Sequence, residues 1–281
     1  MSDISLTAGM RNNLLSLQNT AQLQSKTQER LASGKKVNSA LDNPTNFFAA
    51  QSHNNRANDL TNRKDGMSEA VQMVKAADAG ITGITALIES AKGVAQAALA
   101  TTSSTDRATF ATTYNSLMTQ VSQLASDSGY RGTNLLTGAN QTVEFAPTTN
   151  AATLQISGFT ATAAGLNITA AGATIGAAGW GDSTTASGTT EINAASTQLE
   201  GALTKLRNQS SSLSANLSVV TTRQDFTDSM INTLQTGADN LTLADMNKEG
   251  ANMLMLQTRQ QLGTTSLSMA SQAAQSVLRL F

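Results

Sequence analysis

The chain has 281 residues, of which 40% are hydrophobic but only 4% aromatic, a composition that suits helices packed closely through small side chains. Its net charge of −1 argues against nucleic acid as a main partner, because there is no surplus of positive charge to release counterions from phosphates. The lack of cysteine excludes disulfides, zinc–thiolate sites and thiol catalysis.

The first predicted element is a helix over residues 1–34. Its apolar residues follow alternating spacings of four and three, which places them on one stripe: Met10, Leu14, Leu17 and Ala21. Gly34 can close the helix after Ser33. We expect a linker over residues 35–56, because Pro44 disfavours the helical conformation in the residue before it.

Two antiparallel helices are predicted for residues 57–132. The apolar positions between Ala70 and Ala98 keep the spacing of three and four, a pattern that indicates coiled-coil packing. Residues 101–104 predict a turn, with Ser104 or Thr105 as the cap of the next helix. That helix is expected to end at residues 129–132, which contain two glycines.

Residues 133–191 have a different composition, rich in Ala, Gly, Ser and Thr. The alternating runs at 141–145 and 154–156 predict small strands in β-hairpins with a small outer loop. The stretch 183–190 predicts a flexible loop, and its hydroxyl groups are candidates for O-glycosylation at Ser183, Thr184, Thr185 and Ser187.

The helical pattern returns over residues 192–238, with an expected interruption at 237–240, and continues over 239–281. The predicted coiled-coil seam between the outgoing and returning helices consists of Val74, Ile81, Ile84, Ile88, Leu199, Leu206, Leu213 and Leu217. The last stripe follows the same spacing to the end of the chain: Leu267, Ala270, Ala274, Val277 and Phe281. We therefore predict a mainly α fold, in which long antiparallel coiled-coil helices form a rod with a small β-hairpin region in the middle of the chain.

No pattern of catalytic, cofactor-binding or metal-binding residues is found, so the sequence predicts a protein that is not an enzyme and needs no cofactor. The single histidine, His53, has no second histidine with which to share a metal. The N-terminal residues lack the apolar core of a cleaved signal peptide. No run approaches the ~18 apolar residues of a membrane span, so no membrane is expected as a partner.

Three stretches together resemble bacterial flagellins. Residues 31–43, LASGKKVNSALDN, resemble the N-terminal flagellin signature, in which a helix ends in LxSG and INSAxDD follows. Residues 129–136, GYRGTNLL, resemble the segment that leads from the flagellin helices into the hairpin region. The segment from Ala244 to Phe281 is similar to the C-terminal flagellin helix, and the three stretches occur in the family's order.

The resemblance implies a structural subunit that polymerises into the extracellular flagellar filament and serves motility. It implies that residues 1–34 and 239–281 pair in a terminal domain at the filament core, through the two apolar stripes described above. The implied partners are copies of the same chain, an export chaperone, and the filament-cap and hook-junction proteins. Export through the flagellar secretion apparatus would be in the unfolded state. A hook–filament junction protein is the alternative, because it shares the terminal helices and the secretion route.

The thin apolar stripes at both ends suggest that these helices fold only on assembly, because ordering costs about 1–2 kcal/mol per residue. The segment 87–96 lies where some flagellins carry a motif that an innate-immune receptor binds. Here Glu89, Ala91 and Gly93 replace its Arg, Arg and Leu, so we expect weak or no receptor activation.

Overall fold

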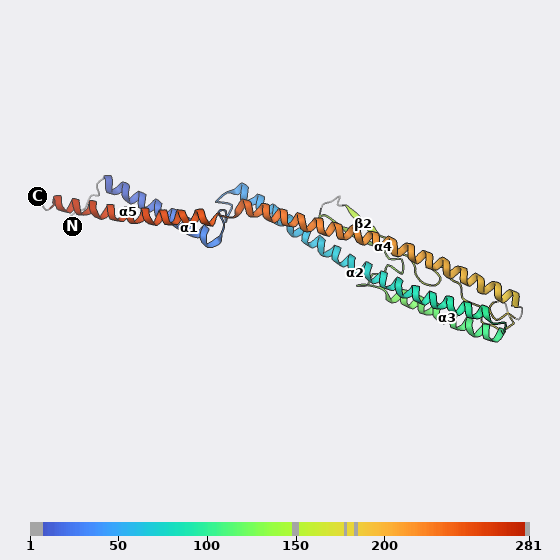
Figure 1. The fold of residues 1–281 in the computed structure, drawn as a ribbon. Coiled ribbons are helices and arrows are strands. Elements are labelled where there is room, and N and C mark those ends of the chain that lie inside the picture. Colours follow the sequence, from blue (N-terminus) through green and yellow to red (C-terminus); the bar gives the residue numbers. More distant parts are fainter. Residues whose placement is uncertain (1–7, 148–151, 177–178, 183–184, 279–281) are drawn as a thin grey trace. The chain divides into compact units, whose positions relative to one another are not determined.

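The computed structural model describes residues 8–147, 152–176, 179–182 and 185–278 (Figure 1). The mainly α fold with a small β region in the middle of the chain is confirmed. The elements in chain order are α1 (Ala8–Ser33), α2 (Pro44–Ala100), α3 (Ser104–Asp127), β1 (Gln141–Glu144), β2 (Thr153–Ile156), α4 (Thr185–Thr242) and α5 (Met246–Leu278). They form two compact units: unit 1 is Met1–Ala57 with Asn232–Phe281, and unit 2 is Asn58–Ile231.

In unit 2, α2 and α4 run antiparallel and are joined by polar contacts at regular intervals. Lys64 Nζ lies 2.6 Å from Asp228 Oδ1, and Lys92 Nζ lies 2.8 Å from Glu200 Oε1, so residues farther along α2 meet residues farther back in α4. Between them Ser210 donates a hydrogen bond of 2.8 Å to Asp78. Ser210 occupies a place where the apolar spacing of α4 is interrupted, and the contact with Asp78 explains why a hydroxyl is accommodated there.

Arg107 joins the end of α2 to the beginnings of α3 and α4. Its side chain is buried, and its Nε donates to the carbonyls of Ala98, at 3.2 Å, and Thr101, at 2.8 Å. Its Nη2 lies 3.2 Å from the Thr189 hydroxyl. The last carbonyls of a helix lack hydrogen-bond donors within the helix, and the Arg107 guanidinium donates to them here. The α3 cap is Ser103, one residue before the predicted position, and its side chain accepts from the Asp106 N–H.

Among its described residues the β region contains one antiparallel hairpin, in which Gln141 pairs with Ile156 and Glu144 with Thr153. Two contacts join it to the helices: Arg63 Nη1 lies 2.6 Å from Glu144 Oε2, and the Arg223 guanidinium lies 5.1 Å from the centre of the Phe145 ring. The remaining loop packs through Trp180, the single tryptophan, whose ring centre lies 4.9 Å from that of Tyr114. A loop of small residues is therefore fixed to the helices by a few large side chains.

Three expected boundaries are wrong. The predicted linker 35–56 is helical from Pro44 onward, because proline is well tolerated at the first position of a helix, where its missing N–H has no partner to lose. The interruption predicted at 237–240 lies instead at residues 243–245, and α4 continues through Gly237. At the other end α4 begins at Thr185, earlier than residue 192.

By length and composition α2 is apolar enough to cross a membrane, which the sequence analysis did not anticipate. A helix that lies in a protein core meets the same criterion. Ile81, Ile84 and Ile88 are at most 4% exposed and belong to the core of unit 2. The apolar character of α2 is thus used in packing against α3 and α4.

Candidate assembly surface

Helices α1 and α5 lie side by side in unit 1 (Figure 1). Thr20 and Thr27 of α1 are buried, as is Leu256 of α5. Thr20 satisfies its hydroxyl by donating to the Ser16 carbonyl at 2.8 Å. Gly263 of α5 allows close approach, because a Cβ there would lie 2.7 Å from the Leu17 Cδ2. The seam is therefore narrow and buries little apolar area.

The structure places the predicted filament-core residues on both sides of this seam. Met10 is buried, while Leu17, Leu267 and Ala270 are half-buried. Leu14 and Ala21 are exposed, because the buried stripe of α1 passes through Thr20 instead of Ala21. Ala274 and Val277 are in α5, with side chains outside the described part, and Phe281 lies outside the described residues. Threonine was missed because sequence reasoning counts it as polar, although it can satisfy its hydroxyl within its own helix.

Large apolar side chains lie on the outside of unit 1. Leu254 is 67% exposed and Leu262 is 64% exposed. The full set among the described residues of unit 1 is Leu14, Leu15, Leu23, Leu41, Phe48, Leu243, Met246, Leu254, Met255, Leu262 and Met269. We name these residues the assembly surface. These exposed apolar side chains are candidates for a protein interaction site.

A polar junction closes unit 1 where α1 ends and α5 begins. Gly34, at φ 70°, ends α1, and the chain then pairs with the residues after α4: Lys36 N–H donates to the Thr242 carbonyl at 2.7 Å, and Ala244 N–H donates to the Gly34 carbonyl at 2.9 Å. The Arg30 guanidinium lies 3.1 Å from Glu249. The junction is thus held by hydrogen bonds and an ion pair, with little dependence on apolar burial.

Asp42 organises the turn that follows α1. Its carboxylate accepts from the N–H groups of Asn38, at 3.1 Å, and Ser39, at 3.2 Å, and lies 3.4 Å from Lys26 Nζ. The backbone hydrogen bond from Asn38, with help from Ser39 and Lys26, lowers the pKa of Asp42 below its usual value. These contacts give a physical role to the NSALD stretch noted in the sequence.

The GYRGTNLL segment forms a second turn, in unit 2. Arg131, at φ 48°, and Gly132, at φ 84°, reverse the chain, and Asn134 donates to the carbonyls of Ala125 and Ser126 at the end of α3. Arg131 Nη1 lies 2.9 Å from Glu69 of α2. Arg131 lowers the pKa of Glu69 through this contact. The turn therefore joins α3 to α2 before the chain enters the hairpin.

The predicted coiled-coil seam residues lie in the core of unit 2. Val74, Ile81, Ile84, Ile88, Leu199, Leu206 and Leu213 are buried, and Leu217 is half-buried against them. The largest buried side chains outside the predicted seam are Trp180, Tyr114 and Met67.

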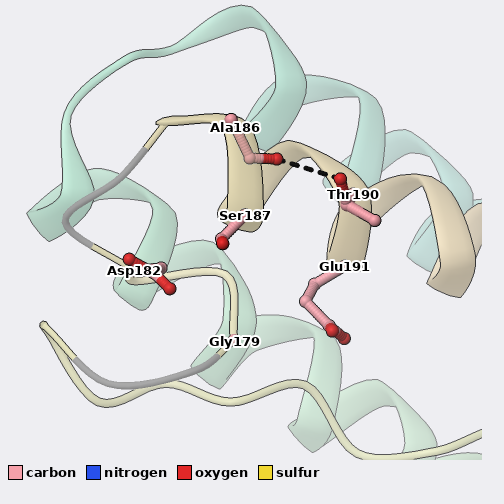
Figure 2. A pocket seen from close by; sticks show the side chains of 6 residues that line it. All are labelled: Gly179, Asp182, Ala186, Ser187, Thr190 and Glu191. Atoms are coloured by element: carbon pink, nitrogen blue, oxygen red, sulfur yellow. Dashed lines mark hydrogen bonds between the residues drawn. The ribbon is translucent and has the colours of Figure 1, made fainter.

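Of the four candidate glycosylation residues, only Ser187 has a described side chain. It is exposed in the first turns of α4 and points into an open hollow between Asp182 and Glu191 (Figure 2). Thr190, beside it, donates to the Ala186 carbonyl at 3.0 Å. Ser183 and Thr184 lie outside the described residues, as does the side chain of Thr185. Within the described part of the chain, no group of three or more His, Cys, Asp or Glu residues could hold a metal ion.

Known proteins match both ends and the full length of the chain. Residues 4–141 match the bacterial flagellin N-terminal helical region, and residues 196–281 match the C-terminal helical region of the same family. The chain is 31% identical over 284 residues to flagellin FljN of Caulobacter vibrioides, with coverage of 100% of this chain and 99% of that protein. It is 27% identical to a flagellin of Brucella melitensis, over 91% of this chain and 90% of the other.

Proposed function

Since the chain belongs to the bacterial flagellin family, we propose that it builds the filament by burying the assembly surface of unit 1 between subunits. Flagellins are structural proteins of the extracellular flagellar filament, which serves motility, and this chain is a subunit of that kind. The observation that carries the proposed packing is the exposure of Leu254, Leu262 and their neighbours on two helices whose own seam is narrow.

Seeded polymerisation tests this function. Purified protein added to short filament fragments is expected to lengthen them continuously, as seen by negative-stain electron microscopy. A hook–filament junction protein, the alternative, would bind the ends and stop there. The flagellins named above match over 91–100% of this chain, whereas no observation favours the junction protein. Fragments that stay at their original length would reject the proposal.

We further propose that α1 and α5 fold on assembly. The α1–α5 seam buries threonines and a glycine contact but few large apolar side chains, so the isolated pair recovers little of the ordering cost of about 1–2 kcal/mol per residue. Hydrogen exchange of residues 254–276 in the subunit and in the filament tests this. We expect rapid exchange in the subunit and protection in the filament. Strong protection in the unassembled subunit would refute coupled folding.

The proposed partners before and after assembly act on the same surface. A cytoplasmic export chaperone would cover the apolar residues of α5 before export in the unfolded state, and the filament-cap and hook-junction proteins would contact α1 and α5 afterwards. The exposure of Leu254, Met255 and Leu262 supports this, because such side chains need cover in the cytoplasm. A chaperone that binds the full chain but not a Leu254→Ser, Leu262→Ser variant would support the assignment, and equal binding to both would contradict it.

A further inference from the structure

Two methionines of α5 lie on the same face of the helix as Leu262. Met255 precedes Leu262 by seven positions and Met269 follows it by seven, and seven residues make about two turns of an α-helix. Met255 is 53% exposed and Met269 is 59% exposed, and both belong to the assembly surface. The face that presents Leu262 to solvent therefore presents a thioether on each side of it.

Most other sulfur groups in the described part of the chain are less exposed. Hydroperoxides oxidise thiols and thioethers, and the chain has no cysteine. Met230, in unit 2, is 37% exposed, and Met253 is half-buried. Four further methionines are buried: Met10, Met67, Met73 and Met118. The thioethers most open to an oxidant in solution are therefore those of Met246, Met255 and Met269, all in α5.

We propose that Met255 and Met269 are oxidation sites through which a hydroperoxide excludes the unassembled subunit from the filament. This inference rests on the proposed assembly through unit 1, which buries the face that the two methionines share with Leu262. A sulfoxide is polar, so a face that carries one on each side of Leu262 has to lose water from both when it is buried. Methionines already packed between subunits are out of reach of the oxidant, so oxidation acts before assembly.

The reaction transfers one oxygen atom to each sulfur. A lone pair of the thioether sulfur attacks the terminal oxygen of the hydroperoxide, the O–O bond breaks and an S–O bond forms. The proton moves to the departing oxygen, which leaves as an alcohol, or as water when the oxidant is hydrogen peroxide. The sulfur loses two electrons and the peroxide gains two, so no further reactant is needed. Methionine sulfoxide reductases reverse the change.

Seeded elongation measures the effect on assembly. Wild-type subunits are treated with hydrogen peroxide until peptide mass spectrometry finds one added oxygen at both Met255 and Met269, and are then added to untreated filament fragments without peroxide. We expect the lowest subunit concentration that lengthens the fragments to rise roughly tenfold, because two side chains lose apolar burial. Treatment with reductases for both sulfoxide epimers should restore the original value. An unchanged concentration after oxidation would overturn the inference.

Leucine variants assign the effect to this face of α5. The pair Met255→Leu with Met269→Leu keeps apolar side chains of similar volume but removes the oxidisable sulfurs, so peroxide treatment should leave its elongation unchanged. Met246→Leu is the matched control. Met246 is 48% exposed but lies nine positions before Met255, about half a turn round the helix, so this variant should stay as sensitive as the wild type. Equal losses in the wild type and the paired variant would contradict the inference.

A second measurement needs no substitution. Partly oxidised wild-type subunits are polymerised on untreated fragments, and filaments are separated from the subunits left in solution. We expect the sulfoxide fraction at Met255 and Met269 to be several-fold lower in the filaments, and finished filaments to gain little oxygen at these residues under the same peroxide. Equal fractions in filaments and solution would overturn the inference and leave the proposed function intact. Failure of untreated subunits to polymerise would instead overturn both.

Discussion

At the scale of single residues, Tyr114 makes the stability of unit 2 depend on pH. Its ring is fully buried against Trp180, and burial raises the pKa of its hydroxyl to about 12 from an ordinary 10.0. The unfolded chain loses this proton near pH 10, whereas the folded protein keeps it to about pH 12. The contribution of Tyr114 to the unfolding free energy is therefore complete below pH 10 and is lost as pH rises from 10 to 12.

Tyr114→Phe tests this dependence. The Tyr114 hydroxyl is buried without a partner in the described structure, so its removal is expected to leave stability at pH 7 unchanged or to raise it by about 1 kcal/mol. Urea unfolding followed by circular dichroism at pH 7 and at pH 11 is the measurement. The variant should lose less stability than the wild type between the two values. A wild-type loss that equals that of the variant would show that Tyr114 does not titrate in this way.

Arg107 is the second residue whose role is specific. Its planar guanidinium serves two carbonyls and a hydroxyl at once, and a lysine ammonium cannot reproduce that geometry. We expect Arg107→Lys to lower the unfolding free energy of unit 2 by roughly 1.5–3 kcal/mol. The exposed Arg207 provides a control, since Arg207→Lys should change the free energy little. Equal effects of the two substitutions in urea unfolding would contradict this role.

At the scale of elements, the cap of α3 offers a test with an adjacent control. Ser103 accepts a hydrogen bond from Asp106 N–H at 3.3 Å, whereas Ser104 is the first residue of the helix. Ser103→Ala is expected to lower the unfolding free energy by about 1 kcal/mol, and Ser104→Ala to change it by much less. Thermal unfolding of both variants measures the difference. A larger effect at Ser104 would show that the helix cap is Ser104, as predicted from the sequence, and not Ser103.

Periodicity and turn chemistry predict most of the helices and their buried faces. The boundaries that they miss are those where two local signals compete. The spacing of three and four identified the buried face of α2 and α4, and Gly34 identified the end of α1. The predicted start of α2 is wrong because the prediction treats Pro44 as a helix breaker. Proline breaks a helix interior but begins a helix readily. The stripe of α1 was placed one residue away, because Thr20 is buried although it is polar. The junction contacts between residues 34–36 and 242–244 join distant parts of the chain and have no local signal.

At the scale of the whole molecule, we expect the exposed leucines of unit 1 to stabilise the filament and not the subunit. Leu262 is 64% exposed, so Leu262→Ser is expected to leave the urea unfolding of the subunit unchanged. In the filament we expect a lower depolymerisation temperature, by an amount that corresponds to about 1.5–3 kcal/mol per subunit if the side chain becomes fully buried there. The exposed Thr264, two positions farther along α5, offers the control Thr264→Ser. A depolymerisation temperature equal to that of the wild type would show that Leu262 is not part of the interface between subunits.

The junction of unit 1 can form only in a polypeptide that contains both residues 34–36 and residues 242–244. Lys36 Nζ donates to the Asn240 carbonyl across 204 positions of sequence, and the backbone pairing beside it spans a similar distance. A ribosome has to release nearly the whole chain before either contact can form, and a product of premature termination lacks one strand of the pairing altogether. Fragments that end between Ile231 and Asn240 keep unit 2 but carry no closed unit 1. Under the proposed assembly through unit 1, we expect chains that end before Asn240 not to enter the filament.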